Sequence, residues 1–103
     1  MINNVIITNL ATDVLVSPDS GTYAGVGMFL CNGGDADEKL NIYAAQKDAG
    51  ASTDNMVIKD LTIKKGETYE FSVEKFLLSS GERVMASGDV GNLVTATVTY
   101  TEI

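Results

Sequence analysis

The sequence has no histidine, no tryptophan, one cysteine and one proline among its 103 residues. Histidine is the commonest general base and the commonest transition-metal ligand, so its absence argues strongly against an enzyme. It also means that Ser79 and Ser80 have no partner for a Ser-His-Asp triad. Cys31 has no second cysteine for an internal disulfide. Because it ends the apolar run 28–31 (MFLC), we expect Cys31 to be a small buried hydrophobe.

Basic side chains are also scarce, with 7 Lys and Arg against 14 Asp and Glu and a net charge of −7. Phosphate backbones and anionic membranes are bound through basic patches, and the pair Lys64 and Lys65 is too short to form one. No apolar run approaches the roughly 20 residues that a bilayer span needs, and the start of the chain lacks the pattern of a signal peptide. The sequence therefore predicts a protein that is made and used in the cytosol, with no nucleic-acid or membrane partner.

Helical periodicity is weak throughout, whereas Thr, Val and Ile are frequent and Gly recurs about every ten residues, which is typical of short strands joined by turns. The clearest strand is 93–101, where Val94, Ala96, Val98 and Tyr100 alternate with threonines. Other strands are expected at 5–8, 14–16, 26–30, 40–45, 61–63, 68–74 and 83–86, with an exposed polar stretch at 46–53. The run 26–30 is nearly continuous in apolar residues, which predicts a strand buried on both faces.

Two local features refine this prediction. Residues 61–63 and 68–74 flank the turn 64–67 (KKGE), so we expect them to form a hairpin. Met56 and Ile58 are out of phase with Leu61 and Ile63, which predicts a β-bulge or a corner at Lys59 and Asp60. The fold class predicted for residues 1–103 is one all-β domain, an antiparallel sandwich or jelly roll of about eight strands; a closed small barrel is the alternative.

Candidate reactive groups are few. The densest acidic cluster is Asp35, Asp37 and Glu38, and alternating carboxylates of this kind can bind calcium. The EF-hand pattern is absent, however, so we expect a solvated turn. Glu70 and Glu74 share one face of a strand, about 13 Å apart, and are expected to face solvent.

The remaining polar candidates have simple structural interpretations. The glycines Gly33 and Gly34 fit a turn, because the rest of a phosphate-binding loop is absent. The lysines are expected to be surface charges, and the tyrosines to be half-buried sheet residues, although tyrosines can also form a sugar-binding platform. These groups are Lys59, Lys64, Lys65, Tyr23, Tyr43, Tyr69 and Tyr100. The sequence thus predicts no catalytic, cofactor-binding or metal-binding residue.

The second half of the chain resembles a group of small virion structural proteins of tailed phages, especially marine and cyanobacterial ones. The resemblance lies in residues 58–69 (IKDLTIKKGETY), 73–78 (VEKFLL), 81–86 (GERVMA) and 94–100 (VTATVTY), and more loosely in 29–32 and 40–43. These segments show an apolar strand, a glycine turn followed by Glu-Thr, Glu-Lys before an apolar triplet, and an alternating strand that ends on an aromatic residue.

The resemblance implies a place in the virion, with assembly in the host cytoplasm and the major capsid protein or another virion protein as partner. A head decoration (cement) protein is the function that we expect, acting as a homo-oligomer, preferably a trimer, because small sandwiches of this kind often sit at symmetry axes. A tail, neck or baseplate component is the close alternative. A carbohydrate-binding or receptor-binding module is the alternative from a different class.

Overall fold

The structure is a computed structural model, and it describes residues 1–71 and 76–103. This part of the chain folds into nine β-strands and contains no helix that could cross a lipid bilayer. The strands are β1 (Ile2–Ile6), β2 (Thr12–Val16), β3 (Thr22–Asn32), β4 (Glu38–Ala45), β5 (Met56–Ile63), β6 (Thr68–Phe71), β7 (Phe76–Ser79), β8 (Arg83–Gly88) and β9 (Val94–Glu102).

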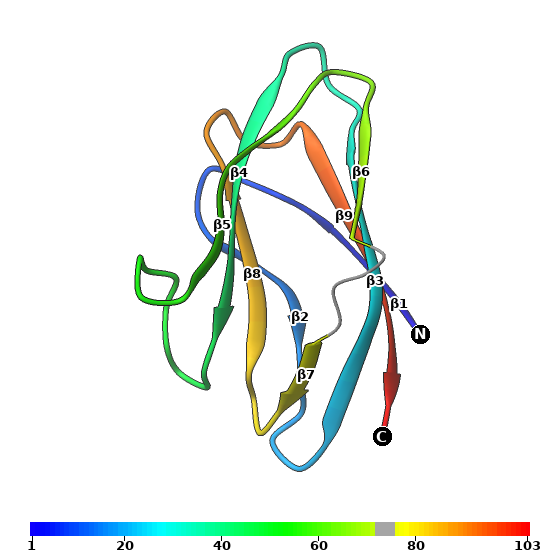
Figure 1. Ribbon diagram of the computed structural model, residues 1–103, viewed down its shortest axis with the longest axis vertical. Helices are drawn as coiled ribbons and strands as arrows, with labels where there is room; N and C mark the ends of the chain where they lie inside the picture. The colour runs from blue at the N-terminus through cyan, green and yellow to red at the C-terminus, as the bar shows by residue number, and fades with distance from the viewer. Residues whose placement is uncertain (72–75) are drawn as a thin grey trace.

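The strands form two antiparallel sheets that face each other (Figure 1). One sheet has the order β1-β9-β3-β6, and β7 also pairs with β3; the other has the order β2-β8-β4-β5. β6 lies along residues 28–31 of β3 and β7 along residues 22–25. The two short strands therefore act together as one interrupted strand at the edge of the first sheet.

The pairings are nested along the chain. β4 pairs with β5, β3 with β6 and β7, β2 with β8, and β1 with β9. This is the arrangement of one long antiparallel hairpin rolled up into two sheets, which is a jelly roll. The predicted all-β sandwich is confirmed, and the described strands fall into two separate sheets rather than the closed barrel that was the alternative.

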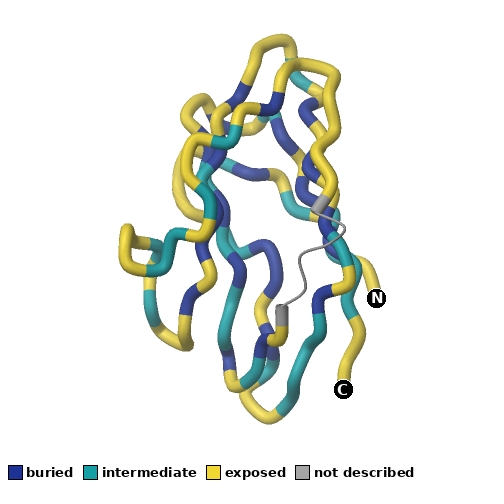
Figure 2. The backbone as a smooth tube through the Cα atoms, viewed as in Figure 1, coloured by how far each residue is buried: buried dark blue, intermediate teal, exposed yellow. Residues whose placement is uncertain are grey.

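The core lies between the two sheets, where buried and exposed residues alternate along the strands (Figure 2). In β9 the side chains of Val94, Ala96 and Val98 have no solvent-exposed area, as the alternation predicted. Leu30 of β3 and Leu40 of β4 meet them from neighbouring and facing strands in the same core cluster. The inner strands β3, β4, β8 and β9 thus contribute about every second side chain to the core, as a sheet with one covered face requires.

The predicted hairpin between 61–63 and 68–74 is wrong. The turn itself is present, since the Glu67 amide donates to the Lys64 carbonyl at 2.9 Å and Gly66 has a φ of +78°. However, β5 pairs with β4 in one sheet and β6 pairs with β3 in the other. The turn therefore carries the chain from one sheet to the other, and β5 and β6 each pair with a strand that lies earlier in the chain.

The predicted bulge at Lys59 and Asp60 is confirmed. Ile58 pairs with Ile42, and the next pair is Leu61 with Leu40, so β5 has one more residue than β4 at this point. Asp60 takes a φ of +56°, and its amide donates to Oδ1 of Asn41 at 2.9 Å. The extra residue brings Leu61 back to the half-buried side after the change of phase.

The prediction that the strand 26–30 is buried on both faces is also wrong, as is the expected burial of Cys31. Met28 and Leu30 face the core, but Val26 is 54% exposed, Phe29 is 41% exposed, and Cys31 is exposed. β3 lies inside its sheet, yet no segment within residues 1–71 and 76–103 covers that sheet's outer face. Of the predicted strand 68–74, β6 occupies Thr68–Phe71, and the remainder lies outside the described residues.

Candidate interaction surface

The outer face of the strands β1, β9 and β3 is regular and has no charged side chain, although the next strand, β6, places Glu70 beside Phe29 on the same face. The pairing registers place its side chains in cross-strand rows: Ile6 beside Thr95 and Cys31, Asn4 beside Thr97 and Phe29, and Ile2 beside Thr99 and Gly27. We call these nine residues the threonine face. β9 supplies its centre, and the two neighbouring strands supply apolar side chains on either side.

The polar groups of the threonine face largely bond within the face. The Thr97 hydroxyl donates to Oδ1 of Asn4 at 2.7 Å, and the Thr99 hydroxyl donates to the Gly27 carbonyl at 3.2 Å. Ile2 and Ile6 are 66% and 57% exposed. A partner that covered these nine residues would bury apolar area, and it would meet the carboxylate of Glu70 at the border beside Phe29, which it would have to match or leave in water because desolvating a charge is costly.

The outer face of the other sheet has a different chemistry. Arg83 Nη1 lies 3.4 Å from Oδ2 of Asp13 across β8 and β2, and Lys39 is exposed on β4. The Tyr43 hydroxyl lies 3.4 Å from Oγ of Ser87. Covering this sheet would require these charged groups to be matched by the partner, so the threonine face is the better candidate for a broad contact.

The acidic cluster is split by the fold. Asp35 and Asp37 are exposed, as the solvated turn predicted, but Glu38 begins β4 with no solvent-exposed area. The Glu38 carboxylate accepts hydrogen bonds from the amides of Val90 at 3.1 Å and Gly91 at 2.8 Å. Within residues 1–71 and 76–103 no group of three or more Cys, Asp or Glu side chains is arranged to hold a metal ion.

Glu38 and Asp89 form an unequal carboxylate pair. Burial raises the pKa of Glu38 above its usual 4.5, and the neighbouring Asp89 raises it further against the opposing effect of the Gly91 and Val90 amides. The pKa of Asp89 is lowered below 3.8, chiefly because its Oδ1 accepts the Lys39 amide at 2.9 Å. The pair stabilises the junction of β4 and the loop after β8, and it has a structural role in the core.

Two of the four tyrosines, Tyr23 and Tyr100, are half-buried, as expected. Tyr23 and Tyr100 lie with ring centroids 4.7 Å apart and planes tilted by 43°, and they line a hollow of about 300 Å³ with Asn3 and Asp13. The side-chain Nδ2 of Asn3 already donates to the Val14 carbonyl at 2.6 Å. Tyr43 is buried, and Tyr69 is 41% exposed beside Leu30 at the sheet edge. The structure brings two of the four tyrosines together rather than forming one platform.

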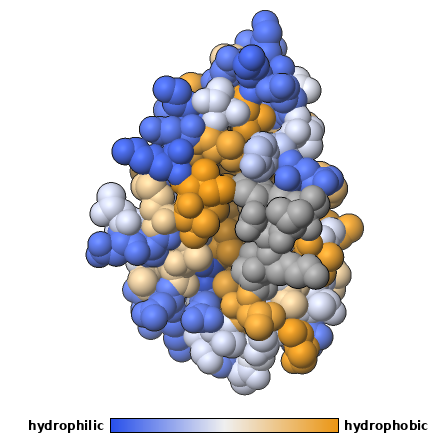
Figure 3. Space-filling model, viewed as in Figure 1, coloured by the Kyte–Doolittle hydropathy of each residue, from blue (hydrophilic) through white to orange (hydrophobic). Residues whose placement is uncertain are grey.

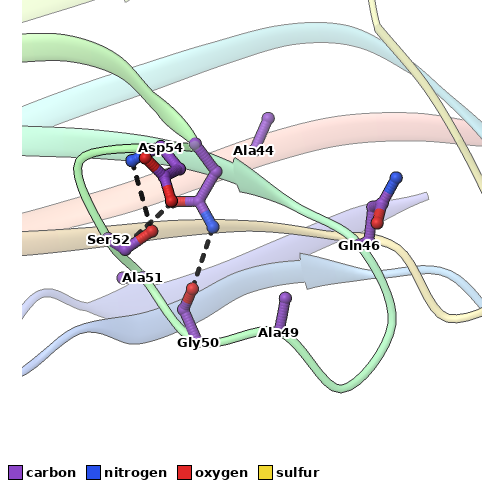
Figure 4. A pocket seen from close by; sticks show the side chains of 8 residues that line it. Ala44, Gln46, Ala49, Gly50, Ala51, Ser52 and Asp54 are labelled. Atoms are coloured by element: carbon purple, nitrogen blue, oxygen red, sulfur yellow. Dashed lines mark hydrogen bonds between the residues drawn. The ribbon is translucent and has the colours of Figure 1, made fainter.

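A larger and open hollow of about 670 Å³ lies in the exposed loop 46–55 (Figure 4). Its wall is made of short side chains and backbone, held by hydrogen bonds from Asn55 Nδ2 to the Gly50 carbonyl at 2.8 Å and from the Ser52 amide to Asn55 Oδ1 at 3.0 Å. The exposure of this stretch was predicted. Among the described residues that line the hollow, Asp54 is the one with an ionisable side chain. The hollow therefore offers little for a specific ligand to bind.

Apolar side chains also gather near the middle of the face shown in Figure 3. On β5, Ile58 and Leu61 are partly buried and pack against the core cluster. Unlike the threonine face, they belong to the edge of the core rather than to an outer surface.

The other predicted positions have structural surroundings. The Gly34 amide donates to Oδ1 of Asn32 at 2.9 Å in the predicted turn. Ser80 takes a φ of +55° in the turn between β7 and β8, and the Ser79 amide donates to Oε1 of Glu82 at 3.0 Å. The lysines predicted to lie at the surface are exposed, namely Lys59, Lys64 and Lys65, and Glu70 is exposed as well. Glu74 lies outside the described residues.

No family model matches this chain, and no curated protein matches it. Among solved structures it is similar to a chain in the acid-stable capsid structure of the Helicobacter pylori bacteriophage KHP30. The two chains share 13% sequence identity and superpose with a TM-score of 0.52 over 99% of this chain and 89% of that chain. The likeness extends over the whole jelly roll, and at this identity it is a likeness of fold.

Proposed function

We propose that this protein is a structural component of a phage virion, and more specifically a decoration (cement) protein that binds the major capsid lattice. The observation that carries the proposal is the threonine face, which is broad, apolar in part and free of charge in a protein with a net charge of −7. The fold that this chain shares with a chain of a phage capsid structure supports the same reading.

The mechanism is adhesion. Each copy lays the threonine face against the lattice and excludes water from Ile2, Ile6 and Phe29, whose burial supplies the driving force. One such contact is modest, but copies bound on one shell act multivalently and hold neighbouring capsid subunits together. The acidic groups elsewhere on the protein keep particles apart by mutual repulsion.

The proposal includes a homo-oligomer, with a trimer or another ring at a symmetry axis of the particle. Assembly takes place in the host cytoplasm, and the protein then resides in the virion. No catalytic, cofactor-binding or metal-binding residue is assigned, because the proposed role needs only surface complementarity.

The test is binding to purified capsids that lack the protein, measured by co-sedimentation, together with the melting temperature of the particles. Phe29→Asp places a charge in the middle of the threonine face and is expected to weaken binding at least about ten-fold. The matched control is Val57→Asp, which places the same charge at a more exposed side chain on the other sheet (62% exposed against 41% for Phe29) and should bind as the unchanged protein does. Undiminished binding by Phe29→Asp would refute the assignment of this face.

A tail, neck or baseplate component is distinguished by its place in the particle. In that case the protein would not bind capsids, and fractionated virions would contain it with the tail in a fixed low copy number. Copy number measured by quantitative mass spectrometry of head and tail fractions separates the two roles.

A carbohydrate-binding or receptor-binding module is the second candidate, and the observation that favours it is the hollow lined by Tyr23 and Tyr100. Aromatic rings of this kind can stack on sugar rings. A glycan panel read with and without calcium tests it, and the absence of any glycan-dependent signal would discard it.

A further inference from the structure

Strand β1 has a free edge whose hydrogen-bonding groups point away from the sheet. The Ile7 amide donates to the Val94 carbonyl and the Tyr100 amide donates to the Met1 carbonyl, both at 2.9 Å. Hydrogen-bonded pairs alternate along an antiparallel ladder, so Val5 and Asn3 also exchange bonds with β9. The amides and carbonyls of the even-numbered residues Ile2, Asn4 and Ile6 therefore face outward from the edge.

This edge has none of the usual protection against pairing with another strand. Natural edge strands are commonly blocked by charged side chains, proline or bulges. β5 has a bulge at Lys59 and Asp60, and the register of β2 shifts after Asp13. β1, in contrast, is an unbroken five-residue ladder, and residues 1–12 contain no charged side chain. β1 is also the outermost strand of its sheet, so among the described residues no strand pairs with its outer edge.

We propose that β1 pairs antiparallel with β1 of a second copy of this chain, about a two-fold axis through Asn4. The sequence INNVI is nearly symmetrical about this residue. The pairing sets Asn4 opposite Asn4 of the second copy and Ile2 opposite Ile6, so each outward amide meets an outward carbonyl. The isoleucines form cross-strand pairs on the outer side, and the two sheets join into one.

The local chemistry fits a second copy better than a charged partner. Residues 1–12 have no charged side chain, and Asp13, which lines the hollow beside Asn3, is paired with Arg83, so the edge of β1 itself presents no charged side chain to a second copy. The Asn4 side chain is held on the threonine face by its bond from Thr97. Two five-residue edges bury less than the roughly 1,000 Å² of a stable interface, so the dimer is weak in solution and is favoured where copies are held close together.

The inference does not depend on a role in the virion, and it is tested on the purified protein. Sedimentation equilibrium up to about 1 mM, the range of weak association, should show a mass that rises toward twice the 10.9 kDa of one chain. Asn4→Pro removes an outward amide that β9 does not use, and proline is tolerated at such edge positions. It should weaken association at least about ten-fold.

Asn4→Ala is the matched control, because it loses the same side chain but keeps the amide, and it should associate nearly as the unchanged protein does. Circular dichroism and thermal unfolding confirm that both variants are folded. Amide exchange at Ile2, Asn4 and Ile6 should slow as the protein concentration rises. A protein that stays monomeric to about 1 mM, equal association of the proline variant, or equal weakening by both variants would overturn the inference.

Discussion

Replacing Glu38 by glutamine tests the role of the buried carboxylate through the pH dependence of stability. The Glu38 carboxylate accepts the amides of Val90 and Gly91 and lies beside Asp89, and burial raises its pKa above 4.5. Glu38→Gln keeps the size and one acceptor oxygen but removes the titration. The difference between the two proteins therefore isolates the carboxylate pair, since every carboxyl group outside the pair is present in both.

The sign follows from proton binding in the two states. The folded protein holds the Glu38 proton more tightly than the unfolded chain, so the resulting stability is fully present below pH 4.5 and is lost as the pH rises through the folded pKa. Asp89 acts in the opposite sense, because its stabilisation is present above pH 3.8 and is lost as the pH falls through its lowered pKa. The unchanged protein is thus strongest relative to Glu38→Gln near pH 4 to 4.5, and it loses that advantage toward neutrality.

The magnitudes are large enough to measure. One titrating proton changes the free energy of unfolding by at most about 1.4 kcal/mol per pH unit. Glu38→Leu provides the matched comparison, because it leaves the Gly91 amide without its acceptor, whereas the Val90 amide keeps Oδ1 of Asp89 at 3.0 Å. A buried amide that loses its partner costs about 1–3 kcal/mol, so this variant is expected to lose about that much stability near neutral pH.

Urea unfolding followed by circular dichroism at several pH values between about 4 and 7 measures both effects. Glu38→Gln should remain within about 1 kcal/mol of the unchanged protein near pH 4.5 and show a flatter pH profile above it. Parallel profiles for the two proteins would mean that the carboxyl group has an ordinary pKa, and the reasoning from burial would fail.

Local physics made part of the fold predictable. The alternation in β9 identified its inward residues Val94, Ala96 and Val98, since a period of two has one interpretation when one face is buried. The change of phase between Ile58 and Leu61 identified the bulge in β5 for the same reason. Each of these predictions depends on neighbouring residues alone.

The pairing of strands was beyond such reasoning. A good turn at 64–67 suggested a hairpin, but turn chemistry specifies only that the chain reverses and not which sheet it enters next. In the nested arrangement β1 pairs with β9 across nearly the whole chain, and no local pattern records that. The exposure of Phe29 and Cys31 was missed for the same reason. Local patterns do not show that β3 belongs to an outer sheet, where an apolar strand keeps one free face.

The candidate surface was half visible in the sequence. The threonines of β9 indicated a half-polar face, whereas Ile2 and Ile6 joined it only through the pairing of the two ends of the chain. The burial of Glu38 had no local signal either, since Asp35 and Asp37 beside it are exposed. Its site is completed from fifty residues away by the Gly91 amide, which residue type alone cannot reveal.

Two further predictions concern these surroundings. The Cys31 thiol, exposed on the threonine face, should react with a maleimide in the folded protein and should be protected when capsids are bound; reaction only after denaturation would contradict its exposure. Gly88→Ala should destabilise the fold by about 1–3 kcal/mol in urea unfolding, because the added Cβ would lie 2.0 Å from Oε1 of the buried Glu38. Gly33→Ala is its control, since a Cβ there meets no atom within 4 Å. The cost of Gly88→Ala should shrink when Glu38 is also shortened to alanine, because the two side chains compete for one space, and additive effects would show that they do not.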